Sequence, residues 1–356
     1  MRDRLTFFKG KRVLVTGDTG FKGSWLSFWL HHLGAHVTGY ALAPKHPKDL
    51  FYRLRLSRRI KHVQGDIRDR AHLQNVFSRT RPEIVFHLAA QSLVRLSYID
   101  PTYTVETNVA GSANLLECVR QTPSVRSLVF ITSDKCYLNK ESRRAYRESD
   151  ELGGHDLYSA SKASAELIFA SYKRSFFDLR KRLGAASVRA GNVIGGGDWA
   201  KDRIVPDCIR AIQKNHPIEL RHPSAIRPWQ HVLDPLYGYL MLAKRLYDHP
   251  QDFSGSWNFG PSMHSTRTVH EVASKIISDW GQGTLHHSPQ NNAPHESQLL
   301  LLNCNKAQRL LGWTPLWNVD RSIAETVEWY HDVHGGEPAA DVTERQILAY
   351  MSSRHD

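Results

Sequence analysis

The segment Thr16–Gly23 constrains the fold more than any other part of the sequence. It reads Thr-Gly-Asp-Thr-Gly-Phe-Lys-Gly, follows a strand-like run over 12–16 and opens a helical pattern over 23–33. Glycines at this spacing allow a tight turn, close approach of the backbone to a pyrophosphate and packing of the helix on the strand. The segment therefore predicts a dinucleotide-binding loop rather than an ordinary strand–helix turn. The loop residues expected to contact the dinucleotide are Gly17, Thr19, Gly20, Phe21, Lys22 and Gly23.

Short apolar runs alternate with helical patterns through the first half of the chain. Further strands are expected over 36–40, 84–88, 127–132 and 186–189, with helices over 70–79, 108–120 and 158–181. This alternation predicts an α/β fold with a Rossmann-type, doubly wound parallel sheet. After Gly191, glycine, proline, tryptophan and histidine become frequent, which indicates a smaller C-terminal lobe. We expect a dinucleotide-binding domain over 1–190, a substrate-binding lobe over 191–334 and a peripheral tail over 335–356.

Composition narrows the class of protein. No apolar run approaches the roughly 18 residues that span a bilayer, and the charged start over 1–12 is unlike a signal peptide. The four cysteines are scattered without metal-ligand spacing, so we expect reduced thiols, no metal site and a cytoplasmic location. The formal charge of +12 is spread along the chain. A solvated surface explains it best, attraction of an anionic small substrate comes second, and a nucleic-acid or membrane partner is not expected.

The second strand leaves the choice of dinucleotide open. An acidic residue near its end would hold the adenosine ribose, but the stretch 39–44 contains none, and Lys45 and Lys48 follow. The chemistry therefore allows either NAD or NADP. Further on, Asp66 follows a strand-like segment and could bond an adenine amino group. It could equally be a turn residue before Arg68.

Two groups of reactive side chains follow in chain order. Ser133, Asp134 and Lys135 come at the end of a buried strand, where α/β enzymes place reactive groups, although a turn or helix cap is the alternative reading. Tyr158 and Lys162 then lie four residues apart on one face of a helix. A lysine in this position would lower the phenol pKa and make Tyr158 a usable base.

Taken together, these motifs resemble the extended short-chain dehydrogenase/reductases over roughly residues 11–330. The resemblance rests on the glycine loop, on His-Leu-Ala-Ala-Gln over 87–91, on Asn108 and on the Tyr158/Lys162 pair. It implies a bound NAD and further contacts to that cofactor. Those contacts would come from Asp66, Ile67, Leu88, Ala89, Ala90, Gln91, Asn108, Tyr158 and Lys162.

Within this superfamily the chain is similar to the CDP-glucose 4,6-dehydratase branch. Sugar-nucleotide dehydratases usually have Thr-Asp-Glu where this chain has Ser-Asp-Lys over 133–135. The stretches 20–25, 152–154, 195–199 and 227–232 also match the branch. One residue departs from it, because the branch typically has histidine where this chain has Asp18, beside the pyrophosphate loop.

The resemblance implies a redox-neutral removal of water from CDP-glucose. Tyr158 would take the 4-hydroxyl proton while hydride leaves carbon 4, Ser133 would share that hydrogen bond, and Lys162 would hold the phenolate. The resulting ketone acidifies the hydrogen on carbon 5, so elimination of the 6-hydroxyl needs one base and one acid. Asp134 and Lys135 are expected to supply them, with the individual roles open. Lysine acts as a base only if its pKa falls, and Asp134 acts as an acid only if protonated.

The C-terminal lobe is expected to bind the nucleotide. Family context assigns Asn192, Arg203 and Arg227 to the diphosphate, because guanidinium groups match phosphate oxygens. Trp199 could pack against the base or belong to the core. Glu296 falls in a loop that contacts substrate in relatives. The resemblance also implies a homodimer or homotetramer that pairs through the helices over 108–120 and 158–181.

Three other readings remain. A sibling dehydratase acting on GDP-mannose or dTDP-glucose would not be expected to carry Lys135. An epimerase would leave Asp134 and Lys135 without a task. A non-catalytic protein of this fold, binding NAD or RNA, is disfavoured by the presence of both Tyr158 and Lys162.

Overall fold

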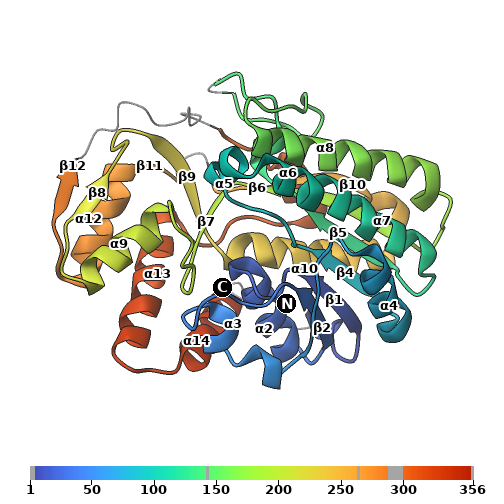
Figure 1. The fold of residues 1–356 in the computed structure, drawn as a ribbon, viewed down its shortest axis with the longest axis horizontal. Helices are drawn as coiled ribbons and strands as arrows, with labels where there is room; N and C mark the ends of the chain where they lie inside the picture. The colour runs from blue at the N-terminus through green and yellow to red at the C-terminus, as the bar shows by residue number, and fades with distance from the viewer. Residues whose placement is uncertain (1–4, 142–143, 263–264, 288–299, 354–356) are drawn as a thin grey trace.

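The central element of the computed structural model, which describes residues 5–141, 144–262, 265–287 and 300–353, is a seven-stranded parallel sheet (Figure 1). Its strand order is β3-β2-β1-β4-β5-β6-β10. The order reverses between β1 and β4, which defines a doubly wound sheet and confirms the predicted fold class. The strands are β1 (Arg12–Thr16), β2 (His36–Ala41), β3 (Lys61–Gln64), β4 (Ile84–His87), β5 (Ser127–Ile131), β6 (Gly184–Ala190) and β10 (Gly255–Phe259).

Both faces of the sheet are buried under helices. In β1, Val13 and Val15 pack into one hydrophobic core and Leu14 into another, as the two-residue period of a strand requires. Because both faces are covered, the strands read as continuous apolar runs. One core includes side chains of α2 (Phe21–His32) and α10 (Leu233–Asp248), and the other includes side chains of α4 (Arg70–Thr80), α7 (Gly111–Gln121) and α8 (Leu157–Tyr172).

Short helical segments connect the main elements. The helix expected over 158–181 ends as α8 at Tyr172 and continues as a π-helical turn, and the one expected over 108–120 begins with another π-helical turn. The short connecting segments are α3 (Leu50–Arg53), η1 (Leu56–Arg58), α5 (Val94–Ile99), α6 (Pro101–Val105), η2 (Glu106–Ala110), η3 (Asp134–Cys136) and η4 (Lys173–Phe177).

The smaller lobe is built on two short sheets. β9 (Ile226–His231) lies between β7 (Asn192–Ile194) and β11 (Thr266–Thr268), and β8 (Ile218–Leu220) pairs with β12 (Leu285–His287). Helices pack around these strands, and Trp313, Trp317 and Trp329 are buried in the hydrophobic core that this lobe shares with one face of the main sheet. The helices of this part of the chain are α9 (Ile204–Gln213), α11 (Pro250–Phe253), α12 (Val269–Trp280), η5 (Ala307–Leu311), α13 (Val319–His334) and α14 (Ala339–Ser352).

The two lobes interleave along the chain. Residues 233–259 fall within the segment assigned to the lobe, yet they supply α10 and β10 to the dinucleotide-binding domain. β10 pairs in parallel with β6, and its Trp257 and Phe259 are fully buried. The predicted single boundary between residues 190 and 191 is therefore wrong for residues 233–259. These residues belong to the dinucleotide-binding domain, because their apolar side chains complete the core beneath the main sheet.

The C-terminal segment packs into the molecule. Helix α14 buries Val342, Ile347 and Tyr350, and the Tyr350 hydroxyl donates to a carboxylate oxygen of Asp234 on α10 at 2.7 Å. The expectation of a peripheral tail over 335–356 is therefore corrected for residues 339–352. Their apolar face is spaced as a buried helix requires.

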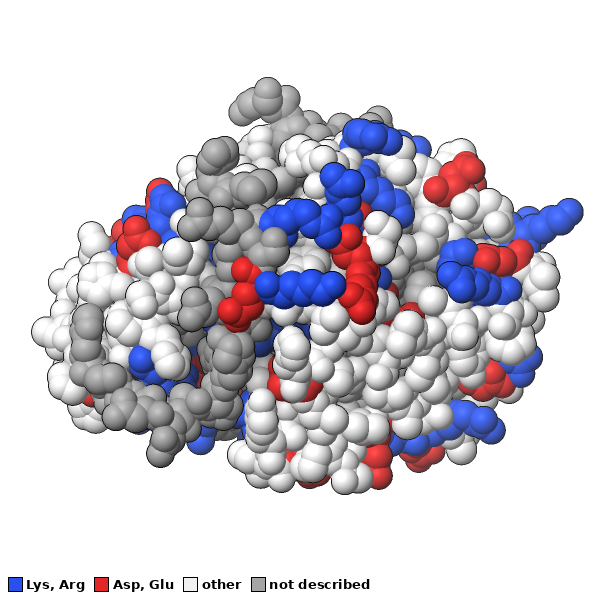
Figure 2. All heavy atoms as spheres, turned by 90° about the horizontal axis from the view of Figure 1, so that it is seen from above, with Lys and Arg blue, Asp and Glu red and all other residues white. Residues whose placement is uncertain are grey.

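The sequence also led to expectations about surface charge, the cysteines and membrane-spanning helices. Basic and acidic side chains are interspersed over the face seen in Figure 2. All four cysteines are buried and unpaired. In the part of the chain that the structure describes, no helix has the length and apolarity needed to cross a membrane.

Candidate active site

The candidate site lies where the carboxyl ends of β1, β4, β5 and β6 meet the smaller lobe. The glycine loop joins β1 to α2, and its geometry leaves no room for side chains. Gly17 has a φ of +80°, and a Cβ added there would lie 2.7 Å from the Ala89 amide nitrogen. A Cβ on Gly23 would lie 2.0 Å from the Gly17 carbonyl oxygen. Close approach of loop, strand and helix therefore requires glycine at both positions.

The remaining loop residues connect the loop to its surroundings. The Thr19 hydroxyl donates to the Leu42 carbonyl at 3.0 Å, just beyond β2. Gly20 is the N-cap of α2, whose first turn carries no acidic residue, so its free amides can face an anion. The Phe21 ring lies against Gly195 of the lobe, where an added Cβ would be 3.2 Å from the ring edge.

The segment after β4 is held by an amide network. The backbone amide of Gln91 donates to Asn108 Oδ1 at 2.8 Å. Asn108 Nδ2 donates to the backbone carbonyl of Gln91 at 3.0 Å and to the Ser161 hydroxyl at 2.9 Å. Asn108 is buried, and these bonds join the loop to α8. Leu88, Ala89 and Ala90 are half-buried and border the glycine loop.

Asp66 borders a hollow of about 450 Å³ that is also lined by Arg68, Asp69, Glu106 and Ala110. Arg68 Nε donates to Asp66 Oδ1 at 3.2 Å, Arg68 Nη2 donates to Oδ2 at 2.7 Å, and these bonds hold the pKa of Asp66 below its usual range. Asp66 therefore makes the contacts expected of a turn residue before Arg68. Its carboxylate also lines the hollow, where an adenine amino group would reach it. Ile67 beside it is buried against Gly111.

The side chain of Asp18 points into the interior. It is fully buried and accepts a 2.7 Å hydrogen bond from His62 Nδ1 on β3. Burial raises the pKa of this carboxyl, and the bond and charge of His62 offset the rise only in part. A Cβ on Gly39 would lie 2.0 Å from Asp18 Oδ2, so glycine in β2 makes room for the carboxylate.

Lys45 and Lys48 follow β2 and left the choice between NAD and NADP open in the sequence. Both residues make contacts within the protein. Lys48 Nζ lies 4.9 Å from the centre of the Trp199 ring, a cation–π contact across the two lobes. The amide nitrogen of Lys45 donates to Asp49 at 2.9 Å.

Ser133, Asp134 and Lys135 form a tight turn at the end of β5. The Ser133 hydroxyl and the Lys135 amide both donate to Asp134 Oδ1, each at 2.9 Å. Burial raises the pKa of Asp134, and the charges of Lys135 and Arg227 and the hydrogen bonds of the turn oppose the rise. The pKa of Asp134 is thus shifted upward, which is the direction that favours a general acid.

Tyr158 and Lys162 face this turn from the first turns of α8, whose N-cap Asp156 accepts from the Ser159 amide at 2.9 Å. Burial raises the pKa of Tyr158 to about 12, opposed by its hydrogen bond with Ser133 and by the charge of Arg203. Burial lowers the pKa of Lys162 to about 8. Nearby positive charge therefore offsets the effect of burial on the Tyr158 pKa only in part, and the effect of Lys162 on the phenol stays a prediction.

The buried Lys22 side chain extends from the glycine loop toward α10. Its ammonium donates to the Tyr239 hydroxyl on α10 at 3.2 Å. Burial and the charges of Arg203 and Lys162 lower the pKa of Lys22 to about 8. The sequence predicted a cofactor contact here from the loop motif alone, without this contact to α10.

The lobe brings two of its predicted arginines to the catalytic turn. Arg203 pairs with Asp198 at 2.7 Å, and its charge lowers the pKa of Tyr158. Arg227 on β9 acts through its charge on Asp134. Asn192 begins β7 and pairs with β9. Trp199 stacks edge-on against Tyr330, with ring centres 5.2 Å apart. Glu296 lies outside the described residues.

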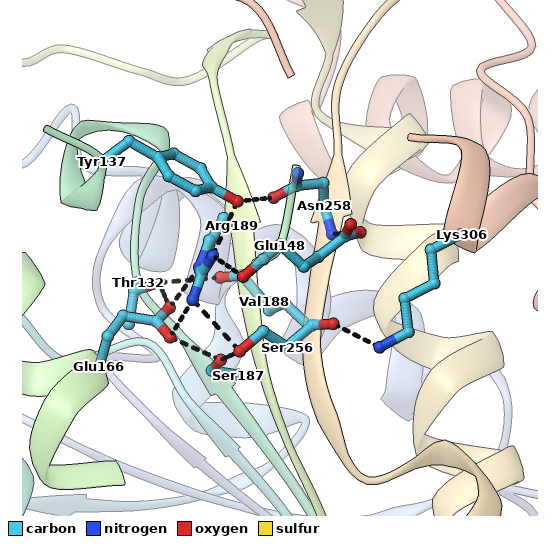
Figure 3. Close-up of polar contacts among 10 residues, drawn as sticks. All are labelled: Thr132, Tyr137, Glu148, Glu166, Ser187, Val188, Arg189, Ser256, Asn258 and Lys306. Atoms are coloured by element: carbon cyan, nitrogen blue, oxygen red, sulfur yellow. Dashed lines mark hydrogen bonds and ion pairs between the residues drawn. The ribbon is translucent and has the colours of Figure 1, made fainter. Parts of the chain in front are cut away.

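A buried polar network behind the turn was not foreseen from the sequence. Figure 3 shows Glu166 of α8 paired with Arg189 of β6, with Thr132 and Tyr137 bonded to this pair. The signal available in the sequence was a charged residue within an otherwise apolar strand, Arg189. Among the described residues, no cluster of three or more side chains has the composition of a metal site.

Comparison with known proteins defines the class to which this fold and site belong. A family model described as GDP-mannose 4,6 dehydratase matches residues 14–326, and the chain belongs to this family. The extended short-chain dehydrogenase/reductase family predicted from the motifs is thereby confirmed.

Individual relatives are more specific. The chain is 47% identical over 351 residues to the CDP-glucose 4,6-dehydratase of Salmonella typhimurium, and the match covers 98% of both chains. It is 25% identical to the dTDP-glucose 4,6-dehydratase of Neisseria gonorrhoeae, over 90% of this chain and 96% of the relative. A solved dTDP-glucose 4,6-dehydratase from Streptomyces venezuelae, with NAD bound, shares the fold with a TM-score of 0.78. That pair is 24% identical and covers 92% of this chain and 99% of the other.

Proposed function

We propose that this chain is an NAD-dependent CDP-glucose 4,6-dehydratase that converts CDP-glucose to CDP-4-keto-6-deoxyglucose. The observation that carries the proposal is the Ser133–Lys135 turn, held at the end of β5 beside Tyr158 and Lys162. Full-length identity of 47% to a CDP-glucose 4,6-dehydratase supports the substrate. Lysine at position 135 distinguishes this chain from dehydratases that carry glutamate there.

The residues present fit a dinucleotide. Gly17 and Gly23 allow close backbone packing at the N-terminus of α2, where the first amides can face a diphosphate, and the hollow beside Asp66 lies next to the end of β3. NAD would supply a hydride acceptor for carbon 4 and a donor for carbon 6. Gly17, Thr19, Gly20 and Phe21 would hold its diphosphate side, and the segment 88–91 would border its inner end. Solved relatives of this fold with NAD bound support this choice over NADP.

In the oxidation step, Tyr158 would accept the 4-hydroxyl proton through its phenol oxygen, with Ser133 sharing the hydrogen bond. With a pKa of about 12 in the protein alone, Tyr158 needs added positive charge nearby to act as a base near neutral pH. That value already includes the charge of Arg203, so the additional charge would come from the oxidised nicotinamide ring of NAD. Lys162, whose Nζ lies 5.9 Å from the centre of the Tyr158 ring, would stabilise the phenolate by its charge.

In the elimination step, we assign the acid to Asp134 and the base to Lys135. Burial favours the protonated form of Asp134, so it can give a proton to the departing 6-hydroxyl. Lys135 is half-buried beside it and, as the neutral amine, would take the proton from carbon 5. Arg203 and Arg227 flank the turn and would bind the substrate diphosphate together with Asn192, while Trp199 borders the lobe side. Glu296 remains a sequence-based proposal.

The chain's assembly, compartment and domain roles are part of the proposal. Apolar side chains remain exposed along the outer face of α5, α8 and the segment after it: Ile99 is 79% exposed, Leu167 59% and Leu179 78%. Pairing of α7 and α8 with a second copy would cover this surface, giving a homodimer or a homotetramer. Four buried, unpaired cysteines suit the reducing cytoplasm. The main sheet would bind NAD and the smaller lobe the nucleotide sugar.

The test is to incubate the purified protein with NAD and, separately, with CDP-glucose, dTDP-glucose, UDP-glucose and GDP-mannose. Mass spectrometry would follow the loss of one water. We expect this loss from CDP-glucose. Loss only from another nucleotide sugar would reassign the substrate, and no loss in protein shown to bind NAD would refute the dehydratase proposal.

A further inference from the structure

The buried pair of Glu166 and Arg189 is fully hydrogen-bonded. Both side chains are about 2–3% exposed. Arg189 Nε donates to Glu166 Oε1 at 3.0 Å, and Arg189 Nη2 donates to Glu166 Oε2 at 2.8 Å. The Ser187 hydroxyl donates to Oε2 at 2.8 Å, and Arg189 Nη2 also reaches the Ser256 hydroxyl at 3.2 Å. A buried ion pair is tolerated only when its remaining donors and acceptors are satisfied in this way.

The same pair binds both ends of the catalytic turn (Figure 3). The Thr132 hydroxyl, immediately before Ser133, donates to Glu166 Oε1. The Tyr137 hydroxyl, at the residue that caps η3, accepts from Arg189 Nη1 at 2.7 Å. The four residues between them, 133–136, include Ser133, Asp134 and Lys135.

The pair also connects this turn to the tyrosine–lysine helix. Glu166 lies one helical turn after Lys162 on α8, on the same face. β5, β6 and α8 therefore meet at one buried carboxylate. A shift of this carboxylate would move the turn relative to Tyr158 and Lys162, and misplacement of reacting groups by about 1 Å can cost 100-fold in rate.

We propose that Glu166 and Arg189 are positioning residues that hold the Ser133–Lys135 turn in register with Tyr158 and Lys162. This inference rests on the proposed function. Tyr158 and Lys162 are held by the capped helix α8 itself, whereas Asp134 and Lys135 depend on the turn. Loosening the turn also shifts Ser133, which slows oxidation at carbon 4, but elimination depends on both Asp134 and Lys135 and therefore slows more.

The test cuts the two connections without leaving a buried charge alone. Thr132→Val removes one hydroxyl, and Glu166 Oε1 keeps its bond from Arg189 Nε. Tyr137→Phe removes the Tyr137 hydroxyl, and Arg189 Nη1 keeps its bond to the Glu148 carbonyl oxygen at 3.1 Å. The matched control is Thr326→Val, which removes a buried hydroxyl bonded to the Ser322 carbonyl at 2.7 Å in α13, away from the site.

We expect Thr132→Val and Tyr137→Phe to lower kcat for CDP-glucose by about 10- to 100-fold with KM unchanged. Reduced cofactor should accumulate, seen as its near-ultraviolet absorbance, because oxidation outpaces elimination. Thr326→Val should match the wild type. Equal kcat in all four proteins, without reduced cofactor, would overturn the inference.

A second measurement does not depend on activity. The Lys135 amide is protected by bonds to Ser133 and Asp134 within the turn. Hydrogen exchange of the peptide that covers the turn should be faster in Thr132→Val and Tyr137→Phe than in Thr326→Val. Unchanged exchange would refute the positioning role. A wild-type chain that binds NAD but leaves CDP-glucose intact would refute the proposed function alone, since exchange would still decide the role of the pair.

Discussion

Replacing Asp134 with asparagine separates the catalytic role of the carboxyl from its structural role. Asparagine keeps the Oδ1 acceptor that binds the Ser133 hydroxyl and the Lys135 amide, both at 2.9 Å, so the turn should keep its shape. It removes the proton that Asp134 would give to the 6-hydroxyl. General acid catalysis typically contributes about 10²- to 10⁴-fold. We therefore expect dehydration to slow by that factor, which corresponds to about 2.7–5.5 kcal/mol of activation free energy.

The same substitution should not destabilise the fold. Because burial raises the folded-state pKa of Asp134, the unfolded chain loses this proton at lower pH than the folded chain. The resulting penalty is absent below the unfolded pKa, grows as pH rises and is complete above the folded pKa. At neutral pH, Asp134→Asn should therefore leave the free energy of unfolding equal or higher than in the wild type.

The assay follows both half-reactions in one sample. Rapid mixing with CDP-glucose should show reduced cofactor forming at nearly the wild-type rate and then persisting, while mass spectrometry shows little loss of water. Thermal melts across pH would measure stability. Dehydration by Asp134→Asn within a few-fold of wild type would refute the acid role, whereas loss of both half-reactions together with a lower melting temperature would show that the carboxyl is needed for structure.

Three further outcomes follow from the geometry. Gly17→Ala should weaken NAD binding, measured by calorimetry, and cost about 1–3 kcal/mol of stability, because the new Cβ meets the Ala89 amide nitrogen at a φ of +80°; wild-type affinity would contradict this. Asp18→Asn should raise the free energy of unfolding more at alkaline than at acidic pH, since burial raises the pKa of Asp18 while its bond with His62 can persist. Ile347→Ala should cost about 2–5 kcal/mol in denaturant melts if α14 is core, and almost nothing if it is a tail.

The main sheet was predictable because its signal is local. The apolar run, the glycine loop and the following helix lie within 22 residues of one another, from 12 to 33. Parallel strands must then be joined by crossovers of one hand, and this places the ends of β1, β4 and β5 at one edge. Ser133 and Tyr158 were found from the same reasoning, since both lie at the ends of predicted elements.

Features that depend on distant contacts were not predictable. Arg189 stands out in β6 as a charge within a buried strand, but its partner Glu166 lies 23 residues earlier, on another element. The placement of 233–259 in the main domain depends on the pairing of β10 with β6. The sign of the Tyr158 pKa shift likewise depends on how much solvent the lobe excludes, and spacing to Lys162 carries no information on that.

The central claim is that one hydride leaves carbon 4 and returns to carbon 6 of the same sugar. CDP-glucose carrying deuterium at carbon 4 tests it most directly, with the product examined by mass spectrometry and NMR. The proposed mechanism predicts that the deuterium appears on carbon 6 of the 4-keto-6-deoxy product, and that Tyr158→Phe abolishes the transfer. Deuterium that stays on carbon 4, or that is lost to solvent during dehydration, would contradict it.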